Sequence, residues 1–364
     1  MKITLVAGAR PNFIKIAPII KAIKQAQSKK MDIEYRLVHT GQHYDKVMSD
    51  TFFEELNIPL PDVNLNCASG TQAEQTASIM VAFEKELIKN PCNLVMVVGD
   101  VTSTMACAIV AKKLNIKVAH VEAGIRSFDL TMPEEINRMV TDSITDYFFT
   151  TSEFANSILK QHGIKESQIF YVGNVMIDTL FANLDRLKKP PFFDPLELKE
   201  SQYFVLTLHR PANVDNPEQL RLFLETIVNH VRNMPVIFPV HPRTAKMFDA
   251  LDLRAKNLIT TQPIGYLEFM YLVKHAKCVI TDSGGITEET TCLGIPCMTL
   301  RDSTERPETC TIGTNELIGT NPDAIKPALE KLFNNDWKKG ATPYLWDGHT
   351  AGRIINVIKE LYAC

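Results

Sequence analysis

The chain has 364 residues, of which 45% are hydrophobic and 22% are charged, a composition typical of a globular protein with a large core. This length favours two domains of ordinary size over one. The formal net charge of -3 gives no reason to expect a nucleic-acid partner, so an anionic ligand would have to meet locally placed arginines and lysines.

The first residues, MKITLVAGARP, lack the apolar core and the cleavage site of a signal peptide. No uninterrupted apolar run reaches the ~18 residues that predict a membrane span. The eight cysteines follow no disulfide spacing and contain no CxxC pair, which favours free thiols in a reducing compartment. We therefore expect a cytoplasmic protein with no membrane partner.

Short apolar runs alternate along the chain with longer segments of helical period, such as Ile14–Ala26 and Ala73–Ile88. The runs lie at 3–9, 35–41, 94–100, 117–124, 146–152, 169–174, 203–209, 235–242, 257–263, 278–285 and 296–302. Most are continuous rather than alternating, as expected for strands of a parallel sheet that is covered on both faces. The pattern predicts a doubly wound α/β architecture.

A domain boundary is expected in DRLKKPPFFDP, residues 185–195, where charge gives way to prolines before the strand–helix rhythm restarts. We predict two Rossmann-like domains that face each other across a cleft. The first covers residues 1–185 and the second covers residues 186–351, with a last helix in 352–364 packing back on the first domain.

Polar residues and glycines gather where the predicted strands end. They are Gly8-Ala9-Arg10, Gly99-Asp100, His120 to Glu122, His209-Arg210, His241-Pro242 and Asp282 to Gly285. Ligands of doubly wound folds bind outside the carboxyl ends of the strands, so this placement predicts a site.

The stretch VITDSGGITEE reads as a strand, a glycine turn at Ser283-Gly284-Gly285 and a helix, which suits an anion at the helix amino terminus. An ordinary cap by Asp282 or Ser283 explains the turn about equally well. Glu289, one turn into the helix, could hold a ribose diol, or it could be one of two first-turn acids that suit the helix dipole.

The stretch GARPNFIKIAP lacks GxGxxG, which counts against a nicotinamide or flavin site. Arg10 and Lys15 near a helix start are unfavourable to its dipole, so a bound anion would explain them. His209 and His241 each end a strand on the same edge as the predicted anion turn, which favours phosphate contact. A zinc site would require closer ligand spacing.

Three acidic positions remain in the first half. Asp100 ends a strand and could equally cap the next helix. Glu122 interrupts the apolar strand of HVEAG. Glu134 follows Pro133 at a predicted helix start, where acids are common, and alone says little.

Together the stretches GARPNFIKIAP, HVEAGIRS, PEEINR, TDSGGITEE and TERPET, in this order and with DGHTAGRI near the end, resemble the non-hydrolysing UDP-N-acetylglucosamine 2-epimerases over nearly the whole chain. The resemblance implies a glycosyltransferase-B-like fold that binds its UDP-sugar in the interdomain cleft, with UDP on the C-terminal domain. It also implies a homodimer. No metal or redox cofactor is expected.

The resemblance implies catalytic roles for Asp100, Glu122, Glu134 and His209. It implies substrate contacts for Arg10, Lys15, Ile264, Phe269, Ser283, Gly284, Gly285, Glu289 and Arg306. Ile264 and Phe269 match the stretch that holds uracil, and Arg10, Lys15 and His209 would face the diphosphate or the reacting end of the sugar.

Five residues depart from the family pattern. Pro211 and Ala212 replace an arginine and a glutamate, and Tyr44 and Asp45 stand where many members read Gln-His-Arg-Glu. Those two regions help other members to bind a second, activating UDP-N-acetylglucosamine, so we expect weak or absent activation. Thr287 replaces the usual glutamine, so the family pattern leaves the preferred sugar open.

The expected reaction is reversible C2 epimerisation by anti elimination of UDP to 2-acetamidoglucal, followed by re-addition. Three alternatives stay open: a 2-epimerase of a modified UDP-N-acetylhexosamine, a hydrolysing 2-epimerase, and a glycosyltransferase of the same fold. A catalytically inactive nucleotide-sugar sensor is a fourth reading from another functional class, although it should have lost carboxylates that are present here.

Overall fold

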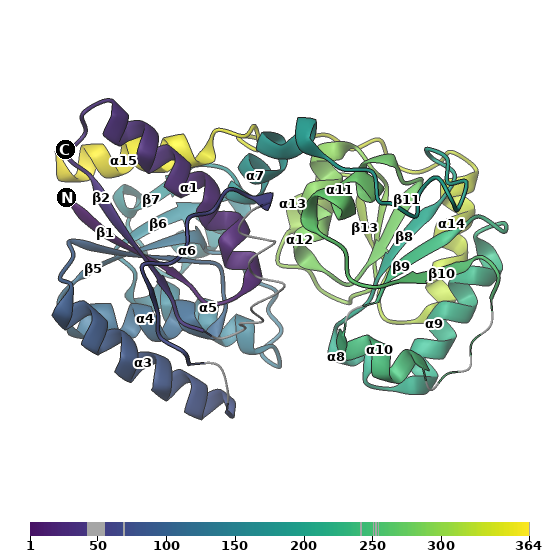
Figure 1. Cartoon of the computed structure of the whole chain (residues 1–364), viewed down its shortest axis with the longest axis horizontal. Coiled ribbons are helices and arrows are strands. Elements are labelled where there is room, and N and C mark those ends of the chain that lie inside the picture. The colour runs from purple at the N-terminus through teal and green to yellow at the C-terminus, as the bar shows by residue number, and fades with distance from the viewer. Residues whose placement is uncertain are drawn as a thin grey trace. The chain divides into compact units, whose positions relative to one another are not determined.

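The computed structural model describes residues 1–41, 55–67, 70–240, 242–249, 251, 253 and 255–363. The chain divides into two compact units, shown in Figure 1. Unit 1 consists of Met1–Ala182 and Tyr344–Cys364, and unit 2 consists of Asn183–Pro343. Unit 2 is therefore inserted in sequence between the two parts of unit 1.

Unit 1 contains a parallel sheet in the order β3-β2-β1-β4-β5-β6-β7. The strands are β1 (Lys2–Ala7), β2 (Glu34–His39), β3 (Val63–Asn64), β4 (Leu94–Val98), β5 (Lys117–Ala123), β6 (Tyr147–Thr150) and β7 (Ile169–Tyr171). The helices are α1 (Arg10–Ser28), α3 (Gln72–Lys89), α4 (Thr102–Lys113), α5 (Pro133–Ile144), α6 (Glu153–Gln161), α7 (Val175–Asn183) and α15 (Thr350–Tyr362), with a 3-10 turn η1 (Glu166–Gln168).

The strands of unit 1 form where the apolar runs are continuous, because both faces of the sheet are covered. Every residue of β4, Leu94–Val98, is at most 1% exposed. Helices α1 and α15 pack together, α3 packs on α4, and α4 packs on α5. Figure 1 shows the first pair on one side of the sheet and α3 and α4 on the other. Each fully buried aliphatic side chain of this kind contributes about 1.5–3 kcal/mol.

Unit 2 contains a second parallel sheet in the order β10-β9-β8-β11-β12-β13. The strands are β8 (Phe204–Thr207), β9 (Val236–Pro239), β10 (Leu258–Thr261), β11 (Cys278–Thr281), β12 (Cys297–Thr299) and β13 (Asn315–Leu317). The helices are α8 (Pro211–Val214), α9 (Pro217–His230), α10 (Pro242–Asp249), α11 (Tyr266–His275), α12 (Gly284–Leu293), α13 (Pro307–Thr311) and α14 (Ile325–Phe333), with 3-10 turns η2 (Leu184–Arg186) and η3 (Pro322–Ala324).

The prediction of an α/β fold with two doubly wound Rossmann-like sheets is confirmed. Every predicted apolar run contains a strand, and the structure adds the edge strands β3 and β13. These two were missed because β3 has only two residues, Val-Asn, and β13, Asn-Glu-Leu, contains two polar residues, so neither forms an apolar run. None of the helices in the described part of the chain is long and apolar enough to cross a membrane.

Candidate active site

In unit 1 the strand order changes direction between β1 and β4, so the turns that follow these paired strands lie together. Asn12 joins the two turns. Its Oδ1 accepts hydrogen bonds from the backbone N–H of Gly8 and of Ala9, both at 3.0 Å, and its Nδ2 donates to the carbonyl of Val98 at 2.9 Å. Gly99 has φ +71°, and a Cβ there would lie 3.3 Å from Lys15 Nζ, so glycine suits this turn. The predicted residues at both strand ends are thus brought to one edge.

Glu122 occupies a bulge at the end of β5, where the pairing with β6 shifts register between Val121 and Ala123. Its φ is +77°, a conformation that costs a non-glycine residue roughly 1–2 kcal/mol. The side chain is 4% exposed and forms an ion pair with Lys15 from α1. Strain of this kind persists only where the surrounding structure enforces it, and it is concentrated at functional sites.

Asp100, after β4, is held by α5. Its Oδ2 accepts from Arg138 Nε at 3.0 Å and from Arg138 Nη2 at 2.7 Å. Arg138 is 1% exposed, and its Nη1 also pairs with Glu135 Oε2 at 2.5 Å. Glu135 in turn accepts from the backbone N–H of Ser127 and of Phe128, which fixes the loop before α5. Asp100 is therefore a carboxylate of fixed orientation.

A buried cluster lies behind the bulge. His120 Nδ1 contacts Asp142 Oδ1 at 2.7 Å, and Arg126 Nη1 lies 2.6 Å from Asp142 Oδ2. Burial acts to raise the pKa of the Asp142 carboxyl, but the hydrogen bonds and charges of His120 and Arg126 outweigh burial and lower it. Asp142 is therefore ionised inside the unit.

The other predicted residues of unit 1 are placed less specifically. Glu134 is partly exposed in the first turn of α5, next to the buried Glu135. Arg10 begins α1, and its side chain lies outside the described part, as do Tyr44 and Asp45.

In unit 2 the corresponding change of strand direction lies between β8 and β11. His209 follows β8, and its Nδ1 lies 2.9 Å from Asp282 Oδ1. Asp282 also accepts from the backbone N–H of His209 and of Arg210, and from Asn213 Nδ2. Burial acts to raise the pKa of Asp282, but these hydrogen bonds and the charge of His209 lower it. The side chain of His209 is 40% exposed, and the buried carboxylate of Asp282 holds it at the edge of the sheet.

Ser283 directly precedes α12, and Gly284 and Gly285 are its first two residues, so the predicted turn lies at a helix amino terminus. The backbone N–H of Ser283 donates to Thr281 Oγ1 at 2.9 Å, so this amide already has an internal partner. Thr287 donates to the Gly284 carbonyl at 2.6 Å and supports the turn from within. The first turn of α12 therefore offers backbone N–H groups on a supported loop.

Glu289 projects from α12 toward α11, where Tyr266 donates to its Oε1 at 2.8 Å. Burial raises the pKa of Glu289 to about 7, against a smaller lowering by the Tyr266 hydrogen bond. Ile264 and Phe269, the predicted uracil contacts, are half-buried on either side of Tyr266 in the chain. The structure therefore joins the predicted ribose residue to the predicted uracil stretch.

Arg306, at the start of α13, is 2% exposed and forms an ion pair with the buried Glu288 of α12. This pair fixes α13 to α12. A second arginine–carboxylate pair, Arg301 with Glu305 at 2.8 Å, lies in the preceding loop.

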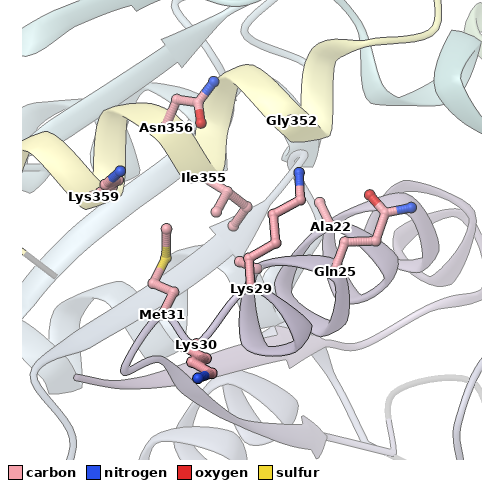
Figure 2. A pocket seen from close by; sticks show the side chains of 10 residues that line it. Ala22, Gln25, Lys29, Lys30, Met31, Gly352, Ile355, Asn356 and Lys359 are labelled. Atoms are coloured by element: carbon pink, nitrogen blue, oxygen red, sulfur yellow. The ribbon is translucent and has the colours of Figure 1, made fainter.

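A surface hollow of about 540 Å³ lies elsewhere in unit 1, between the end of α1 and helix α15. Figure 2 shows Lys29, Lys30 and Lys359 around it, with Ile355 at its base. None of the predicted site residues lines this hollow. The described residues also hold no group of three or more His, Cys, Asp or Glu side chains placed to bind a metal ion.

Four residues that support the site were not predicted from the sequence, namely Asn12, Arg138, Asp142 and Tyr266. On α5 a signal was present, because Glu135, Arg138 and Asp142 are spaced by three and four residues and so share one helix face. Charged residues at this spacing on a predicted helix indicate a polar face, which here supports the carboxylate at the end of β4.

The family described as UDP-N-acetylglucosamine 2-epimerase matches residues 25–359. The UDP-N-acetylglucosamine 2-epimerase of Methanocaldococcus jannaschii is 43% identical over 98% of this chain and 99% of its own. The UDP-2,3-diacetamido-2,3-dideoxy-D-glucuronate 2-epimerase of Pseudomonas aeruginosa is 40% identical over 99% of this chain and 100% of its own.

Among solved structures, that of the M. jannaschii enzyme in complex with UDP-GlcNAc and UDP superposes with a TM-score of 0.89 at 42% identity, over 99% of this chain and 100% of that one. The resemblance inferred from the motifs is thereby confirmed along nearly the whole sequence. The chain belongs to the UDP-N-acetylglucosamine 2-epimerase family.

Proposed function

We propose that the protein interconverts UDP-N-acetylglucosamine and UDP-N-acetylmannosamine by inverting C2, without net hydrolysis. The observation that carries the proposal is the pair of fixed carboxylates at the switch point of unit 1, Glu122 with Lys15 and Asp100 with Arg138. The relative from M. jannaschii, which is named as a UDP-N-acetylglucosamine 2-epimerase and has a crystal structure in complex with UDP-GlcNAc and UDP, supports the 2-epimerase part of the proposal.

The chemistry explains why carboxylates alone cannot suffice. C2 of the sugar has no adjacent carbonyl group to acidify its hydrogen, so direct deprotonation by a carboxylate is too slow. If the C1–O bond breaks first, or nearly so, its electron pair leaves with UDP and the positive charge at C1 makes the C2 proton labile. Anti elimination then gives 2-acetamidoglucal. Re-addition of UDP, with a proton delivered to the opposite face, gives the epimer.

Proton transfer on two faces of the sugar requires more than one group. We assign it to Asp100, Glu122 and Glu134, which all lie in unit 1. Each such group contributes typically 10²–10⁴-fold in rate. Negative charge near C1 also stabilises an oxocarbenium-like transition state. Lys15, paired with Glu122, and Arg10 would stabilise the departing diphosphate.

Unit 2 is assigned the nucleotide. The amides of Gly284 and Gly285 at the start of α12 would bind phosphate, whereas the amide of Ser283 already donates to Thr281 Oγ1. Glu289 would hold the ribose diol, with Ile264 and Phe269 on the uracil. His209, oriented by Asp282, would donate to the diphosphate as it leaves. Arg306, anchored to Glu288, completes the substrate-binding set from the start of α13.

The decisive experiment runs the reaction in heavy water with UDP-N-acetylglucosamine. We expect UDP-N-acetylmannosamine with deuterium at C2, seen by proton NMR, and a slow leak of free UDP and 2-acetamidoglucal. Free N-acetylmannosamine as the main product would identify a hydrolysing enzyme. A product that keeps its C2 hydrogen contradicts solvent-exchanging carboxylates, and binding without any turnover would identify a sensor.

A second candidate substrate has a specific observation in its favour. The P. aeruginosa relative, named for a diacetamido uronic acid, is nearly as similar as the M. jannaschii enzyme. A panel that includes both UDP-sugars separates the two candidates. A kcat/KM higher for the diacetamido uronate would move the proposal to a modified UDP-N-acetylhexosamine with the mechanism unchanged.

A further inference from the structure

The turn before Asp100 is tied to strand β5 on two sides. The backbone N–H of Gly99 donates to the Val121 carbonyl at 3.0 Å. The carbonyl of Gly99 in turn contacts His120 Nε2 at 2.8 Å. The peptide groups next to Asp100 are thus held by the two residues that precede Glu122 in the chain.

The far side of the bulge is tied to helix α5. Asp142 Oδ2 accepts from the backbone N–H of Gly124 at 3.1 Å, two residues after Glu122. Its other oxygen, Oδ1, contacts His120 Nδ1 at 2.7 Å. One carboxylate therefore reaches both ends of the segment that carries Glu122.

Both ring nitrogens of His120 have oxygen partners. A carbonyl oxygen only accepts, so Nε2 must donate to Gly99. Asp142 already accepts from the Gly124 N–H and contacts the guanidinium of Arg126, as an ionised carboxylate does. Nδ1 must then donate as well. A ring that donates from both nitrogens has the hydrogen-bonding pattern of an imidazolium ion, here at 0% exposure.

We propose that His120 and Asp142 form a buried ion pair that sets the backbone directly before Asp100 and on both sides of Glu122, and that both are positioning residues for C2 epimerisation. The inference rests on the proposed function. Neither side chain transfers a proton to or from the sugar in this proposal. Their part is to hold the two carboxylates in a fixed relation, because a strained residue at φ +77° keeps its place only if its flanks are held.

The ion pair is tested first without substrate. Protein labelled with 15N in its histidines is examined above neutral pH, and His120→Gln assigns the resonance. We expect both ring nitrogens of His120 to carry hydrogen, whereas the shift pattern of a neutral imidazole would overturn the proposal. Because no turnover is involved, this result is separate from any failure of the proposed function.

The positioning role is tested with a matched pair of variants. Asp142→Asn removes the charge behind the bulge. Asp178→Asn makes the same change at another buried aspartate of unit 1, which accepts from the backbone N–H of Thr350 and of Ala351 at α15. We expect Asp142→Asn to lower kcat about 10²-fold, the effect of a misplacement of about 1 Å. UDP affinity and KM should change by less than about threefold. Asp178→Asn should keep the kcat of the wild type.

An equal kcat for the two variants, or a loss of UDP binding that accounts for the loss of kcat/KM, would overturn the positioning role. If Asp142→Asn does not fold, a second comparison decides. In His120→Gln the side-chain amide can still donate to Gly99, and in His120→Ala it cannot. A higher kcat for the glutamine variant supports positioning, and equal values contradict it.

Discussion

Glu122 concentrates three properties in a single residue: a positive φ, burial and an ion pair with Lys15. The unfavourable backbone conformation and the buried charge both act against stability. Such destabilising features are concentrated at functional sites, so they favour a chemical role for Glu122. Glu122→Gln keeps its size and hydrogen bonding but removes its charge and the proposed proton-transfer group. We expect kcat to fall by roughly 10²–10⁴-fold, with UDP binding by calorimetry retained. Turnover near that of the wild type would leave Glu122 a structural role only.

The raised pKa of Glu289 makes the stability of the protein depend on pH. Burial raises its folded-state pKa to about 7, above the ordinary value of 4.5. Between these two pKa values the folded protein holds a proton that the unfolded chain has lost. The contribution of protonated Glu289 to the free energy of unfolding is therefore fully present below pH 4.5, and it is lost as the pH rises through about 7. The loss amounts to about 3 kcal/mol at most.

Glu289→Gln abolishes this loss. The free energy of unfolding of the variant, relative to the wild type, should therefore increase between pH 5 and pH 8, as measured by urea denaturation. Glu200→Gln, at an exposed glutamate of the same unit, should show a constant difference. A constant difference for Glu289→Gln too would contradict the raised pKa.

At the scale of the element, α5 is the main support of the predicted catalytic carboxylates, because one face of it carries Glu135, Arg138 and Asp142. Arg138→Lys keeps the charge but cannot serve Asp100 and Glu135 together. We expect the free energy of unfolding to fall by about 1–3 kcal/mol and kcat to fall with it. The exposed pair Arg221–Glu218 gives a control, since Arg221→Lys should change stability by less than about 0.5 kcal/mol. Equal effects of the two substitutions would contradict the supporting role.

The elements show how much of the fold follows from sequence. Strands such as β4 were predicted because continuous apolar runs report burial on both faces. The strand order was not, since it depends on pairing between distant segments such as β1 and β4. The same limit applies to the site. Glu122 is visible in HVEAG as a break in an apolar run, but its positive φ and its partner Lys15 arise only when α1 and β5 meet.

At the scale of the whole molecule the departures from the family pattern bear on regulation. Pro211 and Ala212 are exposed at the start of α8, where many members carry an arginine and a glutamate. We expect UDP-N-acetylmannosamine to be consumed from the start, without added UDP-N-acetylglucosamine. Progress curves with and without a trace of UDP-N-acetylglucosamine test this. A lag that the trace abolishes would show that a second site persists.

The homodimer implied by the family stays a prediction. Light scattering should give a mass of twice 41.0 kDa.

The two-part composition of unit 1 affects how the chain can fold during synthesis. Residues up to Ala182 leave the ribosome first, but α15, which packs on α1, follows only after roughly 160 further residues. At ≈ 5–20 residues per second this delay is on the order of ten seconds or more. During that time the side of α1 that α15 covers stays open to water, while unit 2 emerges as an uninterrupted stretch and can fold completely. The nascent chain is therefore expected to finish its middle before its beginning.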